Sequence, residues 1–272
     1  MVHLTSKGKL RIAGITLFVL LPILSFQNCA RATFSAGSAQ TGLNTDDNNT
    51  YGVITQTGQP SCREELTALT VPVKMFFVVD ISGSNLSNGS QPGSDPQKSV
   101  RGGSMTRFFN TFSTKANFSW GLITFNNSIA NTIVANSNAS AMSSALTNFI
   151  ALTDQGNTPY LAALDEVRLR IADDSGRAQG TKYVVVFLSD GLPNPDVDDN
   201  TLRSRVQNVA AVVPGQISFN TVYYGQTNAV ASERLKMMSQ AGSGNFLDTN
   251  LNPTGQAFLI SDLISLPGVI CH

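Results

Sequence analysis

Three short segments of the sequence carry oxygen-bearing side chains whose spacing suits a hard metal ion. The first, residues 80–84, reads Asp-Ile-Ser-Gly-Ser and offers the carboxylate of Asp80 and the hydroxyls of Ser82 and Ser84. Alternate side chains of an extended segment point the same way, and Gly83 permits a tight turn. Such a cluster of oxygen ligands favours Mg²⁺ or Mn²⁺ over a soft metal.

The other two segments place a hydroxyl and a second carboxylate in loops farther along the chain. Thr158 lies in the sequence Gly-Asn-Thr-Pro, which opens a predicted helix, and Asp190 follows the strongest predicted strand. Because ligand sites of open α/β sheets form outside the carboxyl ends of the strands, we expect both loops to meet Asp80 at one sheet edge. Each residue also has an ordinary interpretation, since the acids and Thr158 could cap helices and the serines could belong to turns.

Composition removes several other classes of function. The chain has two histidines, His3 and His272, one near each end. A Ser-His-Asp triad, a Cys-His pair and a histidine-built zinc site within the fold are therefore excluded. The sequence holds neither a Gly-x-Ser-x-Gly elbow nor a Gly-x-x-x-x-Gly-Lys phosphate loop. Lys and Arg number 18 against 18 Asp and Glu, so no basic excess indicates a nucleic-acid partner.

The segments that must position these residues alternate between strand-like and helix-like patterns. Short apolar runs indicate buried strands, and apolar residues at helical spacing indicate amphipathic helices. The alternation predicts an α/β three-layer sandwich, in which helices flank a mainly parallel central sheet and the second and third strands form a hairpin. We expect strands over 73–79, 118–125, 128–134, 183–188, 217–224 and 245–248, and helices over 104–116, 142–152, 158–171, 201–213, 231–241 and 254–265.

Taken together, the candidate ligands match a known pattern. Over about residues 70–265 the chain resembles a von Willebrand factor type A domain, the fold shared with integrin I domains. That family's metal-ion-dependent adhesion site has the motif Asp-x-Ser-x-Ser, a distant Thr and a later Asp at a strand end. Residues 120–125, Trp-Gly-Leu-Ile-Thr-Phe, also resemble the family's second strand. The motif positions fall, in order, on Asp80, Ser82, Ser84, Thr158 and Asp190.

The resemblance implies a non-enzymatic, adhesion-type module that binds protein through a divalent cation, Mg²⁺ with Mn²⁺ or Ca²⁺ as alternatives. Two carboxylates neutralise such an ion, and hydroxyls fill positions without adding charge, so the ion can accept an Asp or Glu of a partner. The expected partner is therefore a protein or peptide with an acidic residue. Two alternatives remain: a metal-assisted hydrolase that uses the same carboxylates, and a structural envelope lipoprotein with a vestigial site.

The amino-terminal residues have the pattern of an export signal. Three basic residues precede an apolar run over residues 12–26, which is shorter than the roughly 20 residues that span a bilayer. Cys29, directly after this run, resembles the lipidated cysteine of bacterial lipoproteins, whereas residues 30–32, Ala-Arg-Ala, offer an ordinary signal-peptidase site. We expect an outer-membrane lipoprotein of the cell envelope, with a secreted or periplasmic protein as the alternative.

These patterns divide the chain into a signal peptide of lipoprotein type over residues 1–29, a flexible polar tether over 30–65 and a folded domain over 66–272. Cys62 and Cys271 lie at the two ends of the body of the protein. In an oxidising compartment they could form a disulfide, because domain termini often lie close together. The alternative is a pair of buried free thiols.

Two acidic stretches outside this set have other interpretations. Residues 196–200 resemble a calcium-binding loop, but Thr201 and Gln207 stand where such a loop has Gly and Glu, so we interpret them as a solvated loop and helix start. The long loop over residues 86–103 contains Asp95 and borders the predicted site. We expect this loop either to shape the choice of partner or to be an inert surface excursion, and its two basic residues are too few for a basic patch.

Overall fold

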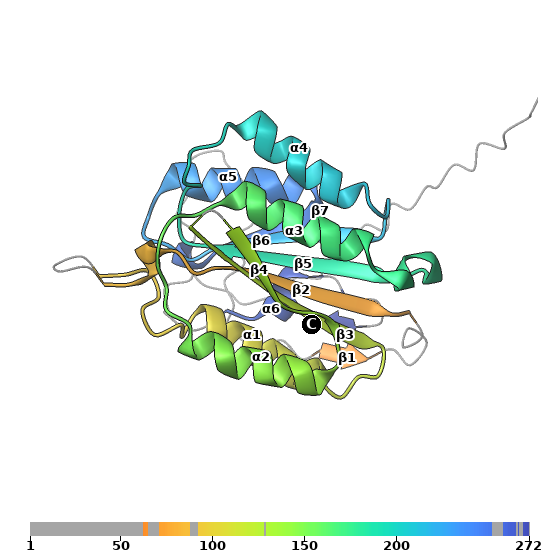
Figure 1. Cartoon of the computed structure of the whole chain (residues 1–272). Coiled ribbons are helices and arrows are strands. Elements are labelled where there is room, and N and C mark those ends of the chain that lie inside the picture. The colour runs from red at the N-terminus through yellow and green to blue at the C-terminus, as the bar shows by residue number, and fades with distance from the viewer. Residues whose placement is uncertain are drawn as a thin grey trace, which may run out of the picture. The chain divides into compact units, whose positions relative to one another are not determined.

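A six-stranded sheet runs through the middle of the domain, with helices on either side (Figure 1). The computed structural model describes residues 62–64, 71–87, 92–127, 129–251, 258–264, 266 and 269–271. The predicted signal peptide, its Cys29 and most of the predicted tether lie outside these ranges. In the described part of the chain, no helix combines the length and the apolar character needed to cross a bilayer.

The strand order is β4-β3-β2-β5-β6-β7, and every neighbouring pair is parallel except β3 and β4. The expected hairpin and the mainly parallel sheet are therefore confirmed. The inner strands are continuous apolar runs because both faces of the sheet are covered. The strands are β2 Val73–Asp80, β3 Phe118–Asn126, β4 Ile129–Ser137, β5 Lys182–Ser189, β6 Ile217–Tyr223 and β7 Ser243–Asp248.

Two groups of helices pack on the two faces of this sheet (Figure 1). One face is covered by α1 Arg101–Phe112, α2 Ala139–Ala151 and the short α6 Ile260–Leu263. The other face is covered by α3 Tyr160–Ala172, α4 Asp199–Ala210 and α5 Ala229–Ala241. The predicted three-layer α/β sandwich is confirmed.

Strand β2 builds both hydrophobic cores at once. Met75 and Phe77 belong to the core under α1 and α2, whereas Phe76 and Val78 belong to the core under α3, α4 and α5. Successive side chains of a strand point to opposite faces, so an unbroken apolar run supplies both layers. Each such buried side chain contributes about 2 kcal/mol, which fixes the register of β2 and the position of its last residue.

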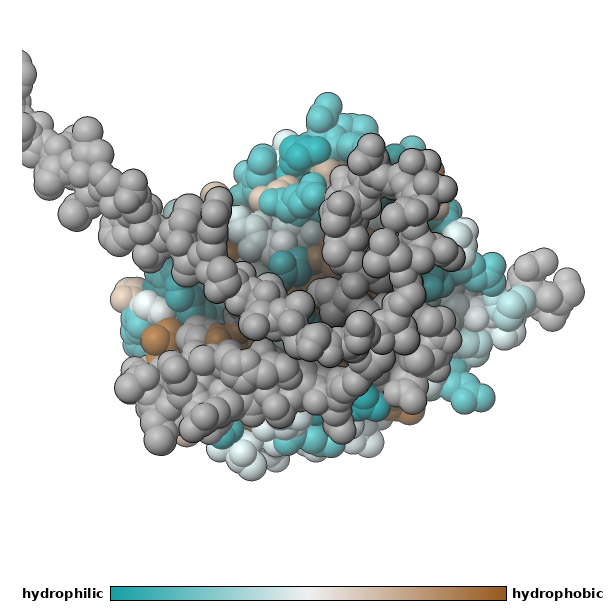
Figure 2. Space-filling model, turned by 180° about the vertical axis from the view of Figure 1, so that it is seen from behind, coloured by the Kyte–Doolittle hydropathy of each residue, from teal (hydrophilic) through white to brown (hydrophobic). Residues whose placement is uncertain are grey.

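The face of the domain turned away from the viewer in Figure 1 is shown in Figure 2. Its described surface is mostly hydrophilic, and hydrophobic residues show only in small areas. The described residues on that face therefore present no broad apolar area.

The last helix differs from the sequence-based expectation. A helix over 254–265 was expected, but α6 has only four residues and the two described residues before it are not helical. At its end, Ile264 is extended, and the Leu263 carbonyl accepts a hydrogen bond from the Asn245 side chain at 2.7 Å. This side-chain contact from β7 satisfies a backbone carbonyl at the point where the helix ends.

A separate two-stranded antiparallel sheet joins the two ends of the domain. It consists of β1 Cys62–Glu64 and β8 Val269–Cys271. In its register, Cys62 lies directly opposite Cys271. The backbones of these two cysteines are therefore neighbours although some 200 residues separate them in sequence.

Candidate metal centre

The two predicted acidic ligands lie at the carboxyl ends of adjacent strands. Asp80 is the last residue of β2, and Asp190 directly follows β5. The two strands are parallel, and the last of their paired residues are Val79 and Leu188. Parallel neighbours end at the same sheet edge, so the topology alone brings both carboxylates together.

A continuous chain of hydrogen bonds links four of the five predicted ligands. Asp80 Oδ1 accepts from the Ser82 amide at 2.7 Å, and the hydroxyls of Ser82 and Ser84 lie 3.0 Å apart. The Ser84 hydroxyl donates to Asp190 Oδ1 at 3.0 Å. On the other side of Asp80, Oδ2 accepts from the Ser189 hydroxyl at 2.6 Å. The alternate spacing of the two serines thus does place them on one side of the turn, between the two carboxylates.

The loop that carries Thr158 meets the same turn through its backbone. The Gly83 amide donates to the Gly156 carbonyl at 3.0 Å, and the Gln155 amide donates to the Ile81 carbonyl at 2.8 Å. These bonds fasten the segment just before Thr158 against residues that lie between the predicted ligands. Three segments far apart in sequence therefore meet at one edge of the sheet.

Thr158 is buried and is also joined to the loop that follows Asp190. Its backbone exchanges hydrogen bonds with Asn194 at 3.2 and 2.9 Å, and the Tyr160 hydroxyl donates to the Gly191 carbonyl at 2.6 Å. The alternative interpretation of Thr158 as the cap of α3 is wrong, because α3 begins at Tyr160 without a side-chain cap. Among the described residues, no hydrogen bond joins the Thr158 hydroxyl to the other four predicted ligands.

The electrostatics of this edge are those of a buried, uncompensated pair of acids. Asp80 is fully buried and Asp190 is 6% exposed. Burial and the negative charge of Asp190 raise the pKa of Asp80 to about 7, although hydrogen bonds from Ser189 and Ser82 act in the opposite direction. Asp190 Oδ2 is buried without a hydrogen-bond partner. Within the described ranges, no Lys or Arg forms an ion pair with either carboxylate.

The residues present fit a hard divalent cation. The two carboxylates and the hydroxyls of Ser82 and Ser84 form an all-oxygen donor set, and the buried Oδ2 of Asp190 has no hydrogen-bond partner. In the described part of the chain, no group of three or more His, Cys, Asp or Glu residues could hold a metal ion. A site at this edge would therefore depend on hydroxyls to complete its coordination.

Sequence reasoning missed the ionic residues packed behind this edge. Asp95 is 2% exposed and Arg101 is fully buried, so the interpretation of the 86–103 loop as an inert surface excursion is wrong for this part of it. Helix α1 begins at Arg101 rather than at the expected Ser104. The partner of Arg101 in another loop, Asp154, lies 53 residues away and gives no local signal.

The acidic stretch over 196–200 has the structure expected of it. Asp198 caps α4 by accepting a hydrogen bond from the Thr201 amide at 3.0 Å. Asp196 and Asp199 both pair with Arg234, at 2.7 and 2.8 Å. These acids are exposed and already paired, so the interpretation as a solvated loop and helix start is confirmed.

Residues 75–258 match the family model of the von Willebrand factor type A domain. The chain belongs to this family. The match covers every strand of the large sheet at least in part, and it includes all five predicted ligands. In this VWA domain the ligand motif and the fold thus occur together.

Solved structures of other VWA proteins share the fold at low sequence identity. The VWA domain of SpRpn10 has 14% identity and a TM-score of 0.52, with 71% of this chain and 94% of that chain covered. Proximal thread matrix protein 1 from the mussel byssus, solved with a zinc-occupied MIDAS motif, has 16% identity and a TM-score of 0.53, with 78% and 49% covered. The pilus adhesin SpaC from Lactobacillus rhamnosus GG has 15% identity and a TM-score of 0.50, with 67% and 30% covered. No curated protein sequence matches the chain.

Proposed function

We propose that this VWA protein is an exported, membrane-anchored adhesion module that holds an acidic residue of a partner protein through a divalent cation. The ligands would be Asp80, Ser82, Ser84, Thr158 and Asp190. The observation that carries the proposal is the uncompensated acid pair, in which Asp190 Oδ2 is buried without a partner and Asp80 has a raised pKa. A dication at this edge would remove both the repulsion and the unpaired oxygen.

The chain's own residues have distinct roles in this proposal. Asp80 and Asp190 supply the negative charge that retains the cation, and the three hydroxyls supply neutral oxygens. When bound, the cation contributes a positive charge that a partner carboxylate can approach. Because Mg²⁺ takes six oxygen ligands, the five protein groups leave at least one position for the partner. Neutral donors keep the net charge of the loaded site from becoming negative, so it can attract an acid.

The names of two solved relatives of the fold agree with this proposal. One holds zinc at its MIDAS motif and another is a pilus adhesin. The fold likeness does not carry their ligands over to this chain, so the cation remains Mg²⁺ with Mn²⁺ or Ca²⁺ as alternatives. An acidic protein or peptide ligand and a location in the cell envelope belong to the same proposal.

The domain arrangement completes the proposal. Residues 1–29 would be a lipoprotein-type signal ending at Cys29, and residues 30–65 would tether the domain to the membrane. A disulfide between Cys62 and Cys271 would close the domain. Directly opposite residues of an antiparallel pair have the Cα separation that a disulfide requires, so the register of β1 and β8 supports this bond.

Thermal unfolding of the chain from residue 30 onward, freed of metal, tests the cation site. Adding Mg²⁺, Mn²⁺ or Ca²⁺ at about 100 times its dissociation constant should raise Tm by about 5–10 °C. Asp80→Ala should lose this increase, whereas the control Asp165→Ala should keep it, because Asp165 is a partly exposed acid that pairs with Arg205 and forms no hydrogen bond with the proposed ligands. An unchanged wild-type Tm with all three cations would leave only the vestigial-site alternative.

A second measurement separates adhesion from hydrolysis. An acidic peptide that binds the wild type should lose binding when its carboxylate is replaced by an amide or when chelator is added. Release of product from peptides or phosphoesters, abolished by Asp190→Ala, would instead favour the hydrolase.

A further inference from the structure

A charge-balanced ionic network lies directly behind the proposed cation site. It consists of two acids, Asp95 and Asp154, and two bases, Lys98 and Arg101. All four side chains are at most 5% exposed. Removing one member of such a network leaves a buried charge without its partner, so each of the four depends on the others.

Arg101 is the centre of this network and connects three segments of the chain. Its Nε and Nη2 donate to Asp95 Oδ2 and the Asp95 carbonyl, at 3.1 and 2.9 Å. Nη1 and Nη2 donate to the two carboxylate oxygens of Asp154, at 3.2 and 3.0 Å. Nη1 also donates to the carbonyl of Asp80 at 2.6 Å. These bonds use all five donors of the guanidinium in a planar fork, a geometry that no other side chain can reproduce.

Two of the three connected segments carry proposed ligands. The Asp80 carbonyl belongs to a proposed ligand residue. A bond that holds this carbonyl also holds the Cα atom from which the Asp80 carboxylate side chain extends. Asp154 opens the loop that continues through the backbone bonds of Gln155 and Gly156 to Thr158. A displacement of the Arg101 guanidinium would therefore change the separation between the β2 turn and the Thr158 loop.

The packing around Arg101 extends to the remaining ligands. Its guanidinium lies 5.6 Å from the centre of the Tyr224 ring, and the Tyr224 hydroxyl donates to Asn85 Oδ1 at 3.0 Å. Asn85 Nδ2 in turn donates to the Ser82 carbonyl at 3.2 Å. The Tyr224 amide donates to the carbonyl of Ser189, the residue before Asp190, at 3.3 Å. One buried cation thus contacts, directly or through one neighbour, every segment of the proposed site.

Arg101 fixes these segments without neutralising the proposed ligands. It contacts Asp80 at the carbonyl oxygen and not at the carboxylate, and its charge is opposed by Asp95 and Asp154. Arg101 therefore occupies no carboxylate oxygen of Asp80 or Asp190, and these oxygens stay open to a cation. A positively charged side chain can therefore lie beside a cation site without competing with the ion.

We propose that Arg101 is a positioning residue of the cation site, which holds the Asp80 turn and the Thr158 loop at the separation that the ion requires. This inference rests on the cation site proposed above. Residues that orient metal ligands from behind typically change metal affinity by about 10–100-fold when they are replaced. The effect of Arg101 should appear in affinity, in addition to any effect on folding.

The experiment is a titration of the metal-free chain with Mn²⁺, in which the Kd is measured in two ways. One is calorimetry, and the other is the electron paramagnetic resonance signal of the free Mn²⁺. Arg101→Lys keeps the buried positive charge but cannot bridge three segments, and it should raise the Kd by about tenfold or more. The control, Lys74→Met, breaks another buried ion pair with Asp174, which has no contact with the site. It should lower Tm and leave the Kd unchanged.

Asp154→Asn is the second variant, because it keeps the side-chain shape while it weakens the pairing of the Thr158 loop with Arg101 and Lys98. It should also raise the Kd. Wild-type Kd in either folded variant would overturn the positioning role, and so would failure of both variants to fold, since the network would then act on the fold alone. If the wild type itself binds no Mn²⁺, the proposed function fails instead.

Discussion

Two buried carboxylate clusters lie at opposite ends of the same sheet, and their surroundings are opposite. At the amino end of β2 and β5, Asp174 accepts hydrogen bonds from Lys74 Nζ at 2.5 Å, from the Gly176 amide at 3.2 Å and from the Tyr183 hydroxyl. Burial would raise the pKa of Asp174, but these partners together lower it below its usual range. This acid is satisfied by the protein alone.

At the carboxyl end of the same strands, Asp80 and Asp190 have only hydroxyl and amide donors. Burial and the neighbouring charge raise the pKa of Asp80 to about 7, and one oxygen of Asp190 has no partner. Both clusters are buried, so burial of an acid does not by itself indicate a ligand site. The difference is the missing positive charge, and that is what a cation would supply.

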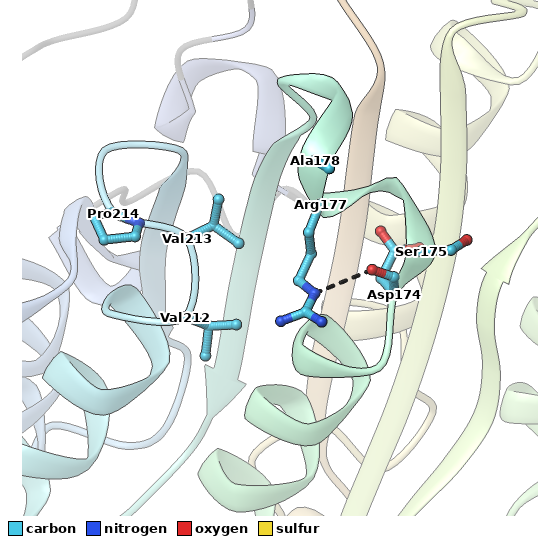
Figure 3. Close-up of a pocket in the computed structure, with 7 residues that line it drawn as sticks. All are labelled: Asp174, Ser175, Arg177, Ala178, Val212, Val213 and Pro214. Carbon is cyan, nitrogen blue, oxygen red and sulfur yellow. Dashed lines mark hydrogen bonds between the residues drawn. The ribbon is translucent and has the colours of Figure 1, made fainter.

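A surface hollow lies at the amino end of the sheet, beside Asp174. A cavity of about 370 Å³ adjoins the satisfied Asp174, and Val212, Val213 and Pro214 line its other side (Figure 3). The Arg177 side chain lies between the two sides, and its Nε donates to the Asp174 carbonyl at 3.2 Å. This hollow therefore lies beside a carboxylate whose partners the protein already supplies.

The largest effect on stability is expected at the amino end. Lys74→Met would leave the Asp174 carboxylate buried without its cation, and the free energy of unfolding should fall by about 3 kcal/mol. Urea unfolding at neutral pH measures this change. A loss below about 1 kcal/mol would mean that Tyr183 and Gly176 satisfy Asp174 without the lysine, and the contrast between the two ends would weaken.

Next in size is a steric change at the carboxyl end. A Cβ at Gly225 would overlap the backbone carbonyl of Asp190, whereas a Cβ at Gly191 would meet open space. Gly225→Ala should therefore destabilise the domain by about 2 kcal/mol and weaken cation binding, while Gly191→Ala should do neither. Equal behaviour of the two variants in urea unfolding and in a Mn²⁺ titration would contradict the close approach of Gly225, which follows β6, to Asp190.

The smallest change should have the opposite sign. In metal-free protein at pH 8, Asp80→Asn removes one of two repelling buried charges and should stabilise the domain by on the order of 1 kcal/mol. The same substitution at the amino end, Asp174→Asn, should destabilise it, because the amide cannot pair with Lys74. Denaturant unfolding of both variants in chelator decides the sign, and destabilisation by Asp80→Asn would remove the main argument for a missing cation.

Local pattern predicted the parts of this molecule that depend on neighbouring residues in sequence. The apolar runs of β2 and β5 and the Asp-x-Ser-x-Ser spacing were sufficient to place Asp80 and Asp190 at one edge, because parallel topology does the rest. The hydroxyl of Ser189 was not expected to contact Asp80, although a hydroxyl at the end of an apolar strand is a weak signal of that kind.

Long-range partners account for the failures. Nothing in the local sequence indicated that Arg101 is buried, since its partner Asp154 is remote in sequence. The first helix was expected from Ser104, whereas α1 begins at Arg101 although two glycines follow and glycine is a poor helix former. A side chain at Gly102 would collide with Ile150 of α2, so this glycine serves the close packing of the two helices. Such constraints become visible only when the elements are assembled.

The position of Asp80 within β2 bears on how the domain would withstand mechanical load. A pull between the amino-terminal side of the domain and a partner held at Asp80 would run along β2, from Val73 to its last residue. This strand is central and is hydrogen-bonded along its length to β3 on one side and β5 on the other. Extraction would have to shear both ladders at once instead of unzipping them one bond at a time. The proposed membrane tether and the proposed partner would thus load opposite ends of one buried strand, β2.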